Sequence, residues 1–169
     1  MMYINDDKSL GDTRVVLDRE TVLAMYRDLK WDAKNNEEKM TDEEIIKDFE
    51  SHDVVKVPVN FDEQQALFFY DLMEEENFSY NNAEEIVDKM IDLEIENFDR
   101  DIDECLCIYD DIQDYGRSLI VERQYFGDVE EKLIEYIDLE QLASDVISLD
   151  RPLYILEFNY DERIIEIFS

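Results

Sequence analysis

Glycine, proline, cysteine and histidine are all scarce in this chain of 169 residues, which has three Gly, two Pro, two Cys and one His. So few Gly and Pro leave no flexible linker and no low-complexity tract. The thiols are Cys105 and Cys107, and the imidazole is His52. Three such side chains are too few for a usual four-ligand zinc site. The two Cys are therefore expected to be buried apolar thiols without a redox or metal role.

Long apolar runs and basic clusters are also missing. No stretch approaches the roughly 18 apolar residues that span a membrane, and the first residues lack the basic and apolar regions of a signal peptide. The chain is therefore expected to be soluble and cytoplasmic. It has no Gly-rich loop to hold a nucleotide and no basic, aromatic patch for direct binding of nucleic acid. We expect neither a catalytic residue set nor a cofactor.

Acidic residues dominate what is present. The chain has 47 Asp and Glu against 16 Lys and Arg, for a formal net charge of -31. Residues 1–60 carry 15 acidic and 9 basic residues, whereas residues 61–169 carry 32 and 7. A net charge of about 2–8 is enough to keep a small domain soluble, and concentrated like charge destabilises a compact state. The excess therefore indicates a function beyond solubility.

The chain should fold despite its charge, because 45% of its residues are hydrophobic and 12% are aromatic. Helix starts are recognisable in the first third. Asp18 is placed to cap a helix over residues 19–31. Thr41 and Glu44 have the spacing of a capping box, in which each side chain accepts a hydrogen bond from the other residue's backbone.

The middle of the chain alternates between strand and helix patterns. Residues 53–59 predict a strand at a sheet edge, because Pro58 has no N–H to donate. Residues 61–76 carry one apolar stripe and predict a helix, and a second helix is expected over about 82–98. Residues 102–109 favour a strand.

The last third has the clearest pattern. A helix is expected at about 111–124, and Asp128 and Asp138 are each placed to cap a later helix. Residues 152–158 and 162–168 predict a β-hairpin.

This order of elements predicts an α+β fold, in the form of an elongated chain of two or three small mixed modules with a C-terminal hairpin. We expect a divergent N-terminal module over 1–52, a central acidic and mainly helical module over 53–100, and a C-terminal α+β module over 101–169.

The apolar stripes on residues 61–98 leave the acidic residues on the exposed face, because burying unpaired carboxylates costs several kcal/mol each. Acids three or four apart on a helix lie about 5–6 Å from one another, and duplex DNA carries one charge per ~1.7 Å of its axis. Several acidic helices and loops together are therefore expected to attract a protein groove that binds phosphates. The candidate contacts are Glu63, Asp71, Glu74, Glu75, Glu84, Asp88, Asp92, Glu96, Asp99, Asp101, Asp110, Asp111 and Asp114.

Two alternatives compete with this DNA-mimic hypothesis. An acidic surface can simply be a solvated one, as in proteins of salt-loving organisms, and a cluster of carboxylates can bind cations. Four acids, Asp99, Asp101, Asp103 and Asp110, have the spacing of a calcium loop. Glu104, however, stands where that loop requires Gly, so no metal site is expected.

Four segments resemble the antirestriction protein ArdA family. His52 and Asp53 are similar to the family's His-Asp-Tyr junction, residues 103–122 resemble its strand, acidic turn and Tyr-bearing helix, and the closing RIIEIFS matches its last strand. The most specific match is FGDVEEKLIEYIDLEQLASD at 126–145, which supplies the family residues Gly127, Val129, Leu133, Tyr136, Ile137, Asp138, Ala143 and Asp145. Glu130, Leu139 and Ser144 replace the Pro, Tyr and Arg found there in the family.

The resemblance covers about residues 52–169, and residues 1–51 lack the family's usual opening. It implies an elongated, acidic DNA mimic of the kind encoded by mobile elements and phages, dimerising through its C-terminal module. Such a protein inhibits type I restriction–modification enzymes by occupying their DNA groove. The eight family residues are expected to be mainly structural. Mimicry directed at a CRISPR effector, a uracil-DNA glycosylase or a nucleoid protein is the alternative.

Overall fold

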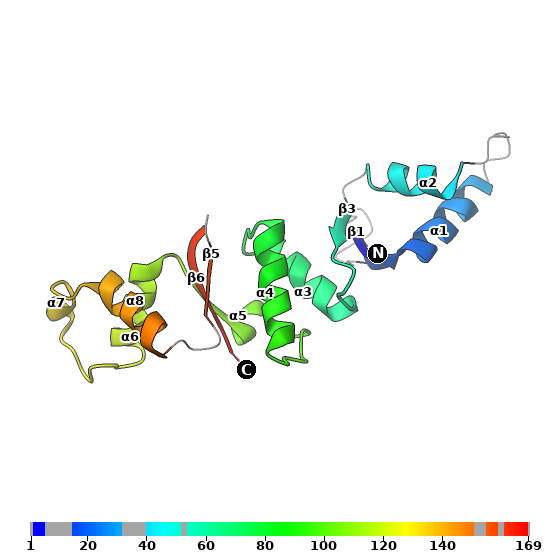
Figure 1. The fold of residues 1–169 in the computed structure, drawn as a ribbon. Helices are drawn as coiled ribbons and strands as arrows, with labels where there is room; N and C mark the ends of the chain where they lie inside the picture. The colour runs from blue at the N-terminus through cyan, green and yellow to red at the C-terminus, as the bar shows by residue number, and fades with distance from the viewer. Residues whose placement is uncertain are drawn as a thin grey trace. The chain divides into compact units, whose positions relative to one another are not determined.

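The computed structural model describes residues 2–5, 15–31, 40–51, 54–150, 155–158 and 161–168. These residues form helices and two antiparallel three-stranded sheets, so the fold is α+β, as the sequence predicts (Figure 1). They divide into an N-terminal unit, Met1–Lys89 with Glu96–Asp99, and a C-terminal unit, Met90–Ile95 with Arg100–Ser169. Over the described ranges, no helix combines the length and the apolar character that crossing a membrane requires.

From residue 19 onward the elements follow the predicted order, whereas strands β1 and β2 were not predicted. The first unit contains β1 (Met2–Asn5), β2 (Val15–Asp18), α1 (Arg19–Trp31), α2 (Asp42–Phe49), β3 (Val54–Val57), α3 (Glu63–Glu74) and most of α4 (Tyr80–Asp92). The second contains α5 (Ile102–Cys105), β4 (Leu106–Tyr109), α6 (Ile112–Val121), α7 (Glu131–Ile134), α8 (Leu139–Asp150), β5 (Ile155–Phe158) and β6 (Asp161–Ile167). The resembling junction at His52 and Asp53 lies outside the described residues.

The first sheet has the order β2-β1-β3, which leaves β3 at an edge, as Pro58 predicts. Tyr3 and Ile4 are neighbours on the central strand and point to opposite faces of the sheet. Both are fully buried, so both faces are covered. On one face Tyr3 packs with Leu17 and with Phe49 of α2, whose ring meets the Tyr3 ring edge-on at 5.4 Å between centroids. Helix α3 contacts all three strands.

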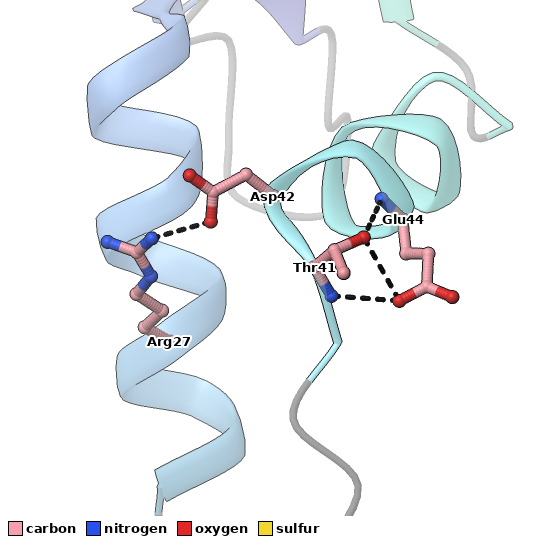
Figure 2. A network of polar contacts seen from close by, with 4 residues as sticks. All are labelled: Arg27, Thr41, Asp42 and Glu44. Carbon is pink, nitrogen blue, oxygen red and sulfur yellow. Dashed lines mark hydrogen bonds and ion pairs between the residues drawn. The ribbon is translucent and has the colours of Figure 1, made fainter.

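Helix α2 begins with the capping box that the sequence predicts. The Thr41 backbone N–H donates to Glu44 Oε2 at 2.8 Å, and the Glu44 backbone N–H donates to Thr41 Oγ1 at 3.3 Å (Figure 2). Arg27 of α1 donates from Nη2 to Asp42 Oδ1 at 2.7 Å. Asp18 also caps α1 as expected, accepting from the Thr21 backbone N–H at 2.7 Å. Local hydrogen bonds of this kind satisfy the free N–H groups of a helix start.

Helix α4 departs from its predicted bounds at both ends. It begins at Tyr80, where the Ser79 hydroxyl accepts from the Asn82 backbone N–H at 3.2 Å. It ends at Asp92, not at Phe98, because Glu94 takes a left-handed conformation with φ of 58°. The Ile95 N–H bonds to the Met90 carbonyl at 3.0 Å and the Glu94 N–H to the Ile91 carbonyl at 2.9 Å. This is a Schellman motif, usually built on Gly.

The C-terminal unit packs α6 and α8 against its sheet, whose order is β4-β6-β5. Tyr109, Tyr115, Leu119, Ala143, Val146 and Ile164 form the buried cluster. At Gly116 a Cβ atom would lie 2.3 Å from the backbone oxygen of Leu139. Gly116 therefore lets α6 lie directly against the first turn of α8.

Two further predictions in this unit need correction. Residues 102–105 form a short helix, and only 106–109 form the strand. Cys105 is buried and Cys107 is half-buried, and both are free thiols. Asp128 does not cap α7, which starts after Glu130 without a side-chain cap. Asp128 instead accepts a hydrogen bond from Gln124 Nε2 at 3.3 Å. The Asp138 cap of α8 and the antiparallel pairing of β5 with β6 are confirmed.

Candidate functional site

The thirteen candidate acids stand mostly at the surface. Ten are exposed, namely Glu63, Glu74, Glu75, Asp88, Asp92, Glu96, Asp99, Asp101, Asp110 and Asp114. Asp71, Glu84 and Asp111 are partly buried. On α4, Glu84, Asp88 and Asp92 recur every four residues and so form a row along one side of the helix.

Some of these acids also support the local structure. Asp88 accepts a hydrogen bond from Asn60 Nδ2 at 3.1 Å. Asp111 caps α6 by accepting from the Asp114 backbone N–H at 2.8 Å. The charge of both groups still adds to the acidic surface. For Asp111, however, the need for a hydrogen-bond acceptor at the start of α6 already explains the residue type.

The calcium-like spacing at 99–110 does not form a binding loop. A calcium loop needs about twelve residues of continuous irregular backbone, whereas α5 and β4 occupy 102–109 here. Throughout the part of the chain that the structure describes, no three His, Cys, Asp or Glu side chains gather closely enough to hold a metal ion.

The family residues of segment 126–145 divide into interior and surface positions. Ala143 is fully buried in the core, Asp138 accepts from the Gln141 backbone N–H at 3.0 Å, and Asp145 accepts from Gln141 Nε2 at 2.8 Å. Gly127 has φ of 73°, the left-handed region that favours glycine. Val129 and Ile137 are partly buried, whereas Leu133 is exposed and Tyr136 keeps 85% of its surface exposed.

A match to a protein family identifies the family of this chain. The model of the family described as antirestriction protein (ArdA) matches residues 16–162 of the chain. The chain belongs to the ArdA family. The match also extends the likeness to residue 16, well into the part that the sequence resemblance left out. Comparison with curated proteins and with solved structures finds no match.

Membership in ArdA identifies the chain as an antirestriction protein, of a family of inhibitors that act against type I restriction–modification enzymes. Two structural properties bear on that inhibition, namely the fold and the exposed acidic side chains.

One feature of this ArdA chain was not recognised in the sequence. The exposed apolar group, defined as Val121, Tyr125, Phe126, Leu133 and Tyr136, extends from the last residue of α6 to two residues past the end of α7. Tyr125 and Phe126 are 52% and 56% exposed and stack edge-on with 5.3 Å between ring centroids. Their pattern is no different from that of core residues, so only the fold reveals their exposure.

A pocket of about 330 Å³ opens beside this group. Its lining is mixed and combines Ile120, Val121, Gly127, Val129 and Ile134 with the polar or charged residues Arg117, Gln124, Asp128 and Glu131. The end of α6, the connecting segment and α7 therefore meet around one hollow, next to exposed aromatic side chains.

A buried acid, Glu166 on β6, is the second feature that the sequence did not reveal. Its Oε2 atom accepts hydrogen bonds from Arg123 and from the Tyr109 hydroxyl, the latter at 3.3 Å. Arg123 Nη2 also donates to the Tyr109 hydroxyl at 3.3 Å. Burial raises the pKa of Tyr109 to about 12, and the hydrogen bond to Glu166 raises the pKa of Arg123 above its ordinary value. The three side chains form one compact polar network.

Proposed function

We propose that this ArdA protein inhibits a type I restriction–modification enzyme by acting as a DNA mimic. The acids of 63–114 would bind the basic groove that otherwise holds the duplex. The observation that carries the proposal is the exposure of ten of the thirteen candidate carboxylates. Within 61–116 the sequence holds 19 acidic residues and only two basic ones, Lys89 and Arg100, so local bases cannot neutralise most of that charge.

The spacing of the acids favours a distributed electrostatic contact. Each exposed ion pair with a groove Lys or Arg contributes about 0.2–1 kcal/mol. Affinity then depends on the number of pairs, association is fast, and added salt weakens the complex. A single neutralisation should change inhibition less than about fivefold, because one pair contributes at most about 1 kcal/mol and the remaining contacts persist.

A competition experiment tests the mimic. A labelled duplex with the enzyme's recognition site is bound to purified type I enzyme, and the inhibitor is titrated in. A variant that neutralises four exposed acids of the segment (Glu74→Gln, Asp92→Asn, Glu96→Gln and Asp101→Asn) should displace the duplex at least tenfold less well.

The matched control removes the same charge elsewhere. It neutralises four acids that are exposed outside 63–114, namely Glu20, Glu43, Glu135 and Glu162. This control should lose much less potency. Equal losses in both variants would mean that net charge alone matters and would overturn the assignment to 63–114, and failure of the wild type to compete with DNA would overturn mimicry itself.

We also propose that two copies associate through the C-terminal unit. The support is the exposed apolar group, because apolar surface concentrated in one segment of a very acidic chain usually marks an interface. A two-fold symmetric interface pairs one surface patch with the same patch of the second copy, and a protruding part beside a hollow makes such a patch complementary to itself. Phe126 and the adjacent pocket of about 330 Å³ supply both.

Sedimentation equilibrium tests this association. Replacing Tyr125 and Phe126 together by Ala should weaken the dimer at least tenfold, as expected for central aromatic contacts. Val59→Ala is the control, because Val59 is 76% exposed but lies in the N-terminal unit. A wild-type chain that remains monomeric at all accessible concentrations would contradict the proposed dimer.

A further inference from the structure

Arg123 connects a surface segment to the interior of the C-terminal unit. It lies two residues after the end of α6 and two residues before Tyr125. Its side chain is 37% exposed, whereas that of its ion-pair partner Glu166 is only 10% exposed. Most acidic residues in the described part of the chain are exposed, so a pairing with a buried acid is the exception there.

The partner of Arg123 lies on a strongly fixed element. Glu166 is on β6, which is the central strand of its sheet and pairs with both β4 and β5. The Tyr109 hydroxyl at the end of β4 contacts both Arg123 and Glu166. The guanidinium carbon of Arg123 also lies 5.9 Å from the centroid of the Tyr115 ring, within the range of a cation–π contact. These contacts link the segment after α6 to the sheet.

The backbone of the same segment is held in an unfavourable conformation. Gln124 has φ of 48°, in the left-handed region that a residue with a Cβ adopts only where its surroundings hold it there. The Arg123 N–H bonds to the Ser118 carbonyl at 3.1 Å, and the Tyr125 N–H bonds to the Leu119 carbonyl at 3.0 Å. The Arg123 side chain thus links this strained turn to the interior. The turn lies directly before Tyr125 and Phe126, whose rings meet edge-on.

We propose that Arg123 is a positioning residue, which through Glu166 holds segment 122–128 in the conformation that presents Tyr125 and Phe126 to a second copy of the chain. This inference rests on the proposed association of two copies. A purely structural ion pair would act on the stability of the whole unit, whereas a positioning residue acts on the local segment and on the affinity between copies.

The experiment compares Arg123→Gln with Lys132→Gln in the full chain. Both variants remove one positive charge from the same unit, but Lys132 pairs with the exposed Glu130. Hydrogen exchange at the Tyr125 amide and the dimer dissociation constant are measured together. Arg123→Gln should speed exchange at Tyr125 at least tenfold and weaken the dimer at least fivefold, while exchange at Ile165 in β6 stays unchanged. Lys132→Gln should change neither quantity by more than about twofold.

A conservative variant covers the case in which Arg123→Gln does not fold. Arg123→Lys keeps the charge next to Glu166 but lacks the fork that also reaches Tyr109, and it should give effects in the same direction but smaller. Uniformly faster exchange across the unit, including Ile165, would make the pair merely structural and overturn the proposal. So would unchanged exchange at Tyr125. A monomeric wild type would instead contradict the dimer, and exchange at Tyr125 would then decide alone whether Arg123 fixes the segment.

Discussion

The two units differ in where a charged side chain is buried and where aromatic side chains are most exposed. In the N-terminal unit, polar groups at the helix starts are exposed and aromatic rings such as Tyr3 and Phe49 fill the interior. In the C-terminal unit, Glu166 is the one charged residue that is buried among those the structure describes, and Tyr125, Phe126 and Tyr136 stand exposed. The first pattern is that of an ordinary stable domain with a charged exterior. The second departs from it twice, because a charged side chain is buried and aromatic side chains are exposed. Such departures are expected where a surface has a function.

The largest expected effect tests whether the C-terminal unit depends on close helix packing. Gly116→Ala would place a Cβ 2.3 Å from the Leu139 backbone oxygen, so α6 and α8 must separate at a cost of about 1–3 kcal/mol or more. Gly127→Ala is the matched change, because it has open space but a φ of 73°. It should cost about 1 kcal/mol. Urea unfolding followed by circular dichroism gives both values, and a larger loss for Gly127→Ala would contradict this account of the packing.

A second prediction tests the ordinary pattern of the N-terminal unit. Thr41→Ala removes the cap of α2 shown in Figure 2 and should lower the free energy of unfolding by about 1 kcal/mol, whereas Thr41→Ser should keep most of it. Hydrogen bonds from Thr41 lower the pKa of Glu44. Its contribution is therefore complete above the ordinary value of 4.5 and is lost as the pH falls through the lowered value. In thermal unfolding between pH 7 and pH 3, the curves for the wild type and Glu44→Gln should therefore converge at low pH, where Glu44 is protonated.

Two buried tyrosines of the C-terminal unit test how much their hydroxyl groups contribute to stability. Tyr109 and Tyr115 are both buried, but only the Tyr115 hydroxyl lacks a hydrogen-bond partner in the described structure. Tyr115→Phe should therefore leave stability unchanged or raise it by up to about 1 kcal/mol, whereas Tyr109→Phe should lower it by a similar amount. A loss in Tyr115→Phe as large as that in Tyr109→Phe would show that the hydroxyl of Tyr115 has a partner after all.

The pKa of Tyr109 adds a check at alkaline pH. Because burial raises this pKa from 10.0 to about 12, the folded state is favoured fully below pH 10 and loses that contribution as the pH rises through about 12. Burial also raises the pKa of Tyr3 to about 12, so the absorbance of tyrosinate at 295 nm should show one late-titrating group fewer in Tyr109→Phe than in the wild type.

The smallest effects concern single acids on the surface. Asp92 is the last residue of α4, where a negative charge opposes the helix dipole, and Glu63 is the first residue of α3, where it is favourable. Asp92→Asn should therefore stabilise the chain by roughly 0.5 kcal/mol and Glu63→Gln should destabilise it by a similar amount. Both should change inhibition less than about fivefold. If one of them abolished inhibition in a folded protein, a specific contact would replace the distributed one.

The sequence predicted those elements whose determinants are local. The caps at Asp18, Thr41 and Asp138 were read correctly because each depends on residues three or four apart. The single apolar stripe expected for α3 was incomplete, because Phe68 and Leu72 are buried as well. The end of α4 was missed because Glu94 adopts a conformation that usually signals Gly, and no Gly stands there. Residues 102–105 were assigned to a strand because short apolar segments fit both patterns.

The parts of the candidate site that stayed hidden depend on distant residues. Arg123 and Glu166 are 43 positions apart, and no spacing rule relates them. Tyr125 and Phe126 look like core residues in the sequence, and only the turn at Gln124 directs them outward. The acids, by contrast, could be placed at the surface in advance, because too few bases were available to pair with them in the interior.

Because this protein exposes both carboxylates and aromatic rings, ionic strength should determine which partner it binds. At 1 M salt, electrostatic forces act over only about 3 Å, compared with about 8 Å at 0.15 M, so the repulsion that keeps identical acidic molecules apart nearly vanishes while contact between apolar rings does not weaken. High salt should therefore favour self-association of this protein, and low salt should favour its binding to a basic surface.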